Sequence, residues 1–149
     1  MVVELGIVIE CREQDGPWGG VLWRPVAVVP GGWTSQQWQL LRAEGRSSRY
    51  YAGPLALELH AGDAEAYREN LADANPSVFV VLRHNANSDE PHDVRPVLVT
   101  AARYEAELHL EGGEDVMEPV PMPDLFVPLI EQFVRDHHVE QPFIKRQRQ

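Results

Sequence analysis

The sequence predicts an α+β fold, a mostly antiparallel β-sheet with two or three helices and a long C-terminal helix. Alternating and β-branched runs separated by turn residues dominate the first 60 residues, and helical periodicity appears only later in the chain. A length of 149 residues is sufficient for one domain with its own core. We therefore expect a single α+β domain at residues 1–140 and a basic C-terminal arm at residues 141–149.

Four strands are expected in the first part of the chain. Odd-numbered apolar residues from Val3 to Cys11 alternate with mostly polar even-numbered residues such as Glu10, which is typical of a half-buried strand. Turn residues at 15–17 follow this strand, so it should form a hairpin with the next one. In the fourth strand, Gly53-Pro54 should mark an edge or a bulge. The four strands are expected at residues 2–12, 21–29, 39–44 and 50–60.

The rest of the chain should contain helices and further strands. Two continuous apolar runs, 78–82 and 97–99, are typical of central strands. Residues 103–111 alternate like a strand, yet their Ala, Glu and Leu content and the following Gly112 favour a helix. Other helices should begin at Asp63, as an N-cap, and at Asp124, and a short strand should lie near residues 116–117.

Charge and composition limit the functions that the chain can have. Acidic residues outnumber basic ones by 23 to 13, and the net charge is −10. Nucleic-acid binders normally have the opposite balance, so we expect no nucleic-acid partner. The sequence has no apolar run of the roughly 18 residues that a membrane span needs, and no signal-peptide pattern. Because the single cysteine cannot form an internal disulfide, we expect a cytoplasmic location.

All four tryptophans lie between residues 18 and 38. They could form a stacking surface for a ligand or the packing of a tryptophan-rich hairpin, and packing is favoured because large aromatic side chains suit pleated sheets. Trp18 and Trp33 remain candidates for contact with a protein partner. The basic arm adds one aromatic and three cationic candidates for partner binding, Phe143, Lys145, Arg146 and Arg148.

Evidence for a metal or catalytic site in the sequence is weak. Glu58 and His60 share one strand face, where a carboxylate and an imidazole could hold a metal or a small molecule. No second histidine has a diagnostic spacing, so we expect neither a metal nor another cofactor. We predict no catalytic residues, because the sequence contains no phosphate-binding loop, nucleophile elbow or zinc-protease motif. Cys11 shares the inward face of its strand and is expected to be structural.

Several segments in the same order resemble an uncharacterised family of bacterial proteins, a domain of unknown function whose genes tend to lie beside those for formate dehydrogenase. These segments read "GPW", "WRPVAVVPG", "LELHAGDAEAYRENL", "VFVVLR", "VTAARYEAE", "GGEDVMEPVPMP" and "HHVEQPFIKR", and together they cover nearly the whole chain. The resemblance implies a non-catalytic accessory, maturation or assembly role around a molybdenum or tungsten formate dehydrogenase. Its subunits would then be the protein partners. Two alternatives stay open, a small-molecule or metal-binding protein that uses Glu58 and His60, and a stoichiometric small subunit of a larger redox complex.

Overall fold

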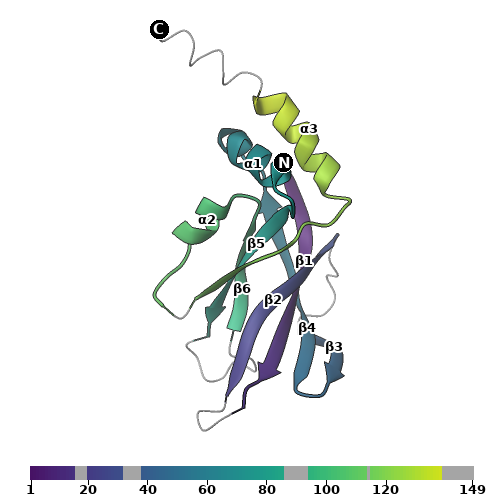
Figure 1. Ribbon diagram of the computed structural model, residues 1–149, viewed down its shortest axis with the longest axis vertical. Coiled ribbons are helices and arrows are strands. Elements are labelled where there is room, and N and C mark those ends of the chain that lie inside the picture. The colour runs from purple at the N-terminus through teal and green to yellow at the C-terminus, as the bar shows by residue number, and fades with distance from the viewer. Residues whose placement is uncertain (16–19, 32–37, 86–93, 114, 139–149) are drawn as a thin grey trace.

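The computed structural model describes residues 1–15, 20–31, 38–85, 94–113 and 115–138 (Figure 1). Strands predominate in these residues, and the α+β class is confirmed. In chain order the elements are β1 (Val2–Glu13), β2 (Val21–Pro30), β3 (Gln39–Glu44), β4 (Ser47–Glu58), the 3-10 helix η1 (Ala61–Asp63), α1 (Ala64–Ala72), β5 (Ser77–His84), β6 (Val94–Thr100), α2 (Arg103–Leu108), β7 (Val116–Pro121) and α3 (Val127–His138).

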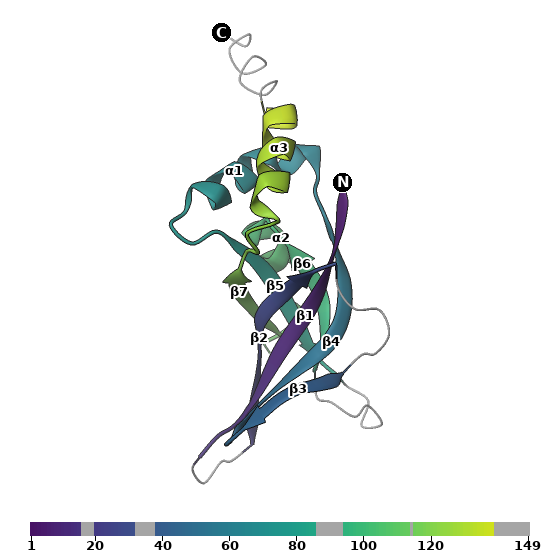
Figure 2. The same ribbon diagram turned by 90° about the vertical axis from the view of Figure 1, so that its right-hand side faces the viewer.

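The strands form two antiparallel sheets. Four strands pair in the order β2-β1-β4-β3 and three in the order β6-β5-β7. The antiparallel pairing of β1 with β2 confirms the predicted hairpin partners. Figure 2 shows the first sheet, with its long strands β1, β2 and β4, running across the second one, with the three-stranded sheet behind it.

The main core lies between the two sheets. Because side chains alternate along a strand, one face of β1 and one face of β5 supply the two sides of this core. Burying such side chains stabilises the fold by about 1.5–3 kcal/mol each. The central residues of these two strands are fully buried and belong to one apolar cluster, namely Leu5, Ile7, Ile9, Val78, Val80 and Leu82.

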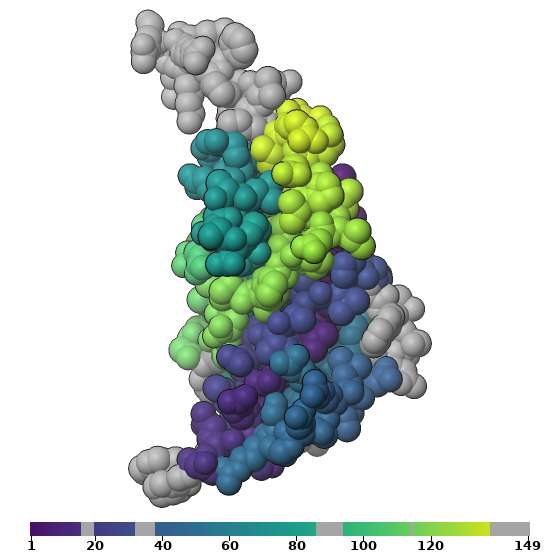
Figure 3. Space-filling view, turned by 45° about the vertical axis from the view of Figure 1, so that its right-hand side comes forward, coloured from purple at the N-terminus to yellow at the C-terminus, as the bar shows by residue number. Residues whose placement is uncertain are grey.

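The helices cover one end and one outer face of this structure. At the end that carries the N-terminus, α1 and α3 lie side by side, as both the ribbon and the space-filling view show (Figures 1 and 3). The rings of Tyr67 in α1 and Phe133 in α3 meet there with their centroids 6.0 Å apart. On the outer face of the three-stranded sheet, Ala106 of α2 packs against Phe79 and Val81 in a second buried cluster. The helix expected within 103–111 is thereby confirmed.

At a bulge between β1 and β4, the side chain of Tyr51 lies against Gly6. The register shifts between Gly6, which faces Pro54, and Val8, which faces Tyr51, and Gly53 has a φ of +103°. Because β4 is an interior strand, Gly53-Pro54 marks the predicted bulge and not an edge. The buried ring of Tyr51 lies over Gly6, where an added Cβ would come within 2.5 Å of the ring atom Cε1. A residue without a side chain is therefore needed at position 6.

The predicted long C-terminal helix is wrong, since α3 has only 12 residues and begins at Val127, not at Asp124. The chain first forms a turn in which the Phe126 amide donates to the Pro123 carbonyl at 2.9 Å. Pro128 then occupies the second helical position, where a missing amide needs no partner.

Two further expectations need correction. β6 is an edge strand and not a central one. Its apolar residues are covered by β4 and α2, and an edge position suits Pro96. Asp63 precedes α1 as expected, but its side chain does not cap the helix. Instead the Asp63 carboxylate accepts a short hydrogen bond from the Tyr104 hydroxyl.

None of the helices in the described residues is sufficiently long and apolar to span a bilayer.

Candidate functional site

The candidate site lies on the outer face of the four-stranded sheet and is built around Glu10. Alternation along β1 predicted that Glu10 would lie on the solvent side, yet only 4% of this residue is exposed. Its backbone neighbours explain the difference. Glu10 pairs with Arg24 of β2 on one side and with Arg49 of β4 on the other, so two long arginine side chains cover it. Two residues further along β1, and therefore on the same face, Arg12 pairs with Ser47 of β4.

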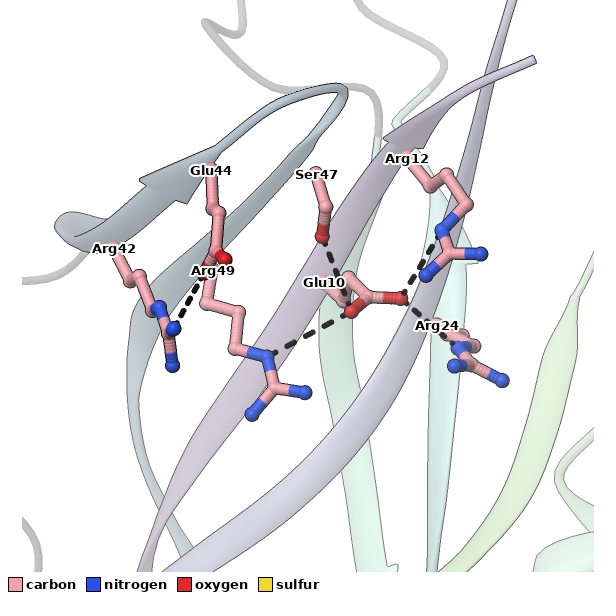
Figure 4. Close-up of polar contacts among 7 residues, drawn as sticks. All are labelled: Glu10, Arg12, Arg24, Arg42, Glu44, Ser47 and Arg49. Atoms are coloured by element: carbon pink, nitrogen blue, oxygen red, sulfur yellow. Dashed lines mark hydrogen bonds and ion pairs between the residues drawn. The ribbon is translucent and has the colours of Figure 1, made fainter. Parts of the chain in front are cut away.

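Glu10 receives contacts on both carboxylate oxygens (Figure 4). On Oε1 it accepts from Arg24 Nε at 3.3 Å and lies 3.9 Å from Arg12 Nε. On Oε2 it accepts from the Ser47 hydroxyl at 3.2 Å and lies 3.7 Å from Arg49 Nε. One carboxylate therefore holds three guanidinium groups and one hydroxyl that come from three adjacent strands.

These contacts keep Glu10 ionised although it is buried. Burial by itself raises the pKa of a carboxyl. Here the hydrogen bonds from Arg24 and Ser47, together with the charges of Arg24 and Arg12, outweigh that effect, so the pKa of Glu10 lies below its ordinary value of 4.5. A carboxylate with a lowered pKa is a weak base, and guanidinium groups stay protonated at all ordinary pH values. The chemistry of the cluster is therefore that of recognition and not of proton transfer.

The three arginines stay partly exposed while they contact Glu10. Each guanidinium contacts Glu10 through Nε, and Figure 4 shows the terminal nitrogens of Arg24 and Arg49 pointing away from the carboxylate. The side chains of Arg12, Arg24 and Arg49 are 58%, 49% and 47% exposed. The two terminal nitrogens form the end of the guanidinium that can hold a carboxylate in a bidentate pair.

An open pocket of about 320 Å³ extends from Glu10 across β4 to β3. At its far side Arg42 and Glu44 form a close ion pair. We call this surface the arginine face and define it by four arginines, two glutamates and one serine, namely Arg12, Arg24, Arg42, Arg49, Glu10, Glu44 and Ser47. It carries an excess of two positive charges in a chain whose net charge is −10.

A larger pocket, of about 600 Å³, lies between α1 and α2. In its wall Asn70 uses its whole amide, because Nδ2 donates to the carbonyls of Ser77 and Ala101 at 2.7 and 2.9 Å while Oδ1 accepts from the Ser77 amide at 3.0 Å. The guanidinium of Arg103 stacks over the Phe79 ring, 4.9 Å from its centroid. Since these polar and aromatic groups already serve internal contacts, we place the candidate site on the arginine face.

All six residues predicted to bind a partner lie outside the described residues, namely Trp18, Trp33, Phe143, Lys145, Arg146 and Arg148. The other two tryptophans do pack with the sheet. Trp23 is 9% exposed, and its ring centroid lies 5.9 Å from that of Trp38 and 6.0 Å from that of Tyr50. For Trp23 and Trp38, the structure thus fits the packing interpretation.

Glu58 and His60 do lie near each other, with Glu58 Oε2 and His60 Nε2 3.7 Å apart. Both side chains are more than 45% exposed, at 59% and 49%. Within the described part of the chain, no group of three or more His, Cys, Asp or Glu side chains is arranged to hold a metal ion. The pair is therefore a surface contact that lacks the further ligands of a closed metal site.

Sequence reasoning missed the arginine face. Glu10, Arg24 and Arg49 stand far apart in the chain, and only the register of β1 with β2 and β4 brings them together. The available signal was a charged residue inside two predicted strands, Glu10 in 2–12 and Arg24 in 21–29, whereas Arg49 directly precedes the predicted strand 50–60.

Comparison with known proteins identifies the family to which the chain belongs. Nothing matches among curated proteins or solved structures. A family model does match residues 4–147, which is nearly the whole chain and includes all of the strands and helices described above except the first two residues of β1. The chain therefore belongs to the family described as "Protein of unknown function (DUF3305)".

Proposed function

We propose that the chain is a non-catalytic accessory, maturation or assembly protein of a molybdenum or tungsten formate dehydrogenase system, and that it binds a partner protein through the arginine face. The formate dehydrogenase context comes from the family resemblance of the sequence motifs. The binding role rests on one observation, the three guanidinium groups that Glu10 holds through Nε while their side chains stay about half exposed.

Such an arrangement favours binding over catalysis. Long side chains normally lose rotamer freedom when they bind, which costs about 0.5–1.5 kcal/mol each. Contacts with Glu10 already restrict these arginines, so part of the loss of rotamer freedom has occurred before a partner binds. The cluster is rich in arginine, which is enriched in the energetically dominant positions of protein interfaces.

Affinity capture tests the proposal in cells that make the formate dehydrogenase. The tagged chain should retain formate dehydrogenase subunits, and a variant with Arg12, Arg24 and Arg49 changed to Gln should lose them. Subunits at a fixed ratio would indicate a stoichiometric subunit, whereas capture of the apo-enzyme alone would indicate a maturation factor. The proposal fails if no dehydrogenase subunit is captured, or if the variant captures the subunits as well as the unchanged chain does.

A further inference from the structure

We propose that the arginine face binds an extended segment of a partner protein that presents at least two carboxylates on one side, from Asp or Glu residues two positions apart. This inference rests on the proposed function and names the chemistry of the partner. Its basis is the outward direction of the terminal nitrogens of Arg24 and Arg49 in Figure 4 and the arrangement of the arginines across three adjacent strands.

The geometry of the sheet favours carboxylates at this spacing. Adjacent strands lie about 4.8 Å apart, and alternate residues of an extended chain point to one side about 7 Å apart. Arg24 and Arg49 lie on the two strands that flank β1, two strand spacings or about 10 Å apart at the backbone, and their side chains converge on opposite oxygens of Glu10. A segment that crosses β1 can therefore direct one carboxylate to each guanidinium, and Arg12 lies beside the same path.

The face also has an apolar contact that suits a peptide more than a free ion. Leu22 of β2 pairs with Arg12 of β1, so both side chains are on the outer face of the sheet. Leu22 is 46% exposed. An apolar side chain of the bound segment can cover it, whereas an inorganic anion leaves it in water.

Charge argues against a nucleic acid as the occupant. The arginine face itself contains the carboxylates of Glu10 and Glu44, and the whole chain has a net charge of −10. Most nucleic-acid affinity comes from the neutralisation of phosphates by basic side chains. A protein with this negative net charge repels a polyanion that has a charge on every nucleotide. A short segment with a few carboxylates meets only the local positive excess.

The test uses purified full-length protein and a fluorescein-labelled eight-residue peptide of alternating glutamate and serine. Fluorescence anisotropy should show binding that weakens as salt rises, since the Debye length falls to about 8 Å at physiological salt. Replacing every glutamate of the peptide with glutamine should abolish the binding. Arg24→Gln and Arg49→Gln should each weaken it about tenfold, which corresponds to the loss of one charge-assisted pair.

Two further variants separate recognition from folding and from net charge. Arg68→Gln removes one positive charge from α1, where the exposed side chain of Arg68 pairs with Glu65, and should leave the affinity unchanged. Arg24→Lys keeps the charge but removes the bidentate group, and should still weaken binding several-fold. Circular dichroism spectra and melting curves show whether each variant is folded, and Arg24→Lys provides the comparison if Arg24→Gln is unstable.

Several results would overturn the inference. The first is peptide binding that Arg24→Gln and Arg49→Gln leave unchanged, or that Arg68→Gln weakens as much as they do. Tighter binding of a single-stranded oligonucleotide or of inorganic phosphate than of the glutamate peptide would exclude the acidic segment. If the peptide binds but no formate dehydrogenase subunit is captured, the proposed function is contradicted and the inference about the acidic segment is not. If capture of the subunits depends on these arginines but the peptide does not bind, the inference is contradicted and the proposed function is not.

Discussion

Replacing Glu10 with Gln should destabilise the protein measurably at neutral pH. The lowered pKa of Glu10 means that its surroundings favour the ionised carboxyl over the neutral one, and Gln resembles the neutral form. The change weakens the contacts with Arg24 and Ser47, at 3.3 and 3.2 Å, and those with two more distant arginines. Because the arginines are about half exposed and can be hydrated, we expect a loss of about 2 kcal/mol and not the larger cost of a fully buried ion pair.

The assay is thermal and urea unfolding followed by circular dichroism. For a chain of this length a loss of about 2 kcal/mol lowers the melting temperature by about 6 °C. Glu4→Gln is the matched control, because Glu4 lies in the same strand and is exposed. It removes the same charge and should have little effect.

The dependence on pH gives the sharper result. The pKa of Glu10 is lower in the folded chain than in the unfolded one, so the stabilisation by its ionised form is fully present above the ordinary pKa of 4.5. It is lost as the pH falls from that value through the folded-state pKa. The stability difference between the unchanged chain and Glu10→Gln should therefore narrow below pH 4.5. A Gln variant as stable as the unchanged chain at pH 7, or a difference that stays constant on acidification, would refute the reasoning.

Three other predictions follow from the fold and the sequence. Gly6→Ala should cost about 1–3 kcal/mol by overpacking against Tyr51, whereas Gly62→Ala, with open space around its Cβ, should leave the melting temperature nearly unchanged. Elemental analysis of the purified protein should find no stoichiometric metal, and bound zinc or iron would make Glu58 and His60 the first ligands to test. Deleting residues 141–149 should weaken capture of the partner and leave the melting temperature unchanged; a lower melting temperature, or capture with the same salt dependence, would show that the arm does not dock the partner.

Local patterns were sufficient to predict most of the individual elements. Alternation in β1 and the turn residues after it predicted the β1–β2 hairpin, and the composition of residues 103–111 predicted α2 in spite of their strand-like alternation. The length of α3 was overestimated because the turn before it continues the same apolar spacing. Such a spacing marks a buried side of the chain, but it does not distinguish a turn from the first helical residues.

Long-range relations could not be predicted in the same way. The edge position of β6 depends on which strands pair. A continuous apolar run occurs in a central strand, but it occurs equally in an edge strand whose two faces are covered by a second sheet and a helix, as in β6. The arginine face depends on register, because a shift by one residue would turn Glu10 to the other side of β1. Alternation alone therefore placed Glu10 on the correct side of the strand, but it could not show the arginines that bury it there.

The affinity of Glu10→Gln for the alternating glutamate peptide tests the central claim most directly. This substitution makes the arginine face more positive by one charge, so attraction by net charge alone would tighten the binding of an acidic segment. In our account Glu10 acts by holding three partly exposed guanidinium groups in place through their Nε atoms, and its loss should weaken binding several-fold in the folded variant at pH 7. Binding that is equal to or tighter than that of the unchanged chain would contradict the claim that Glu10 organises a recognition site.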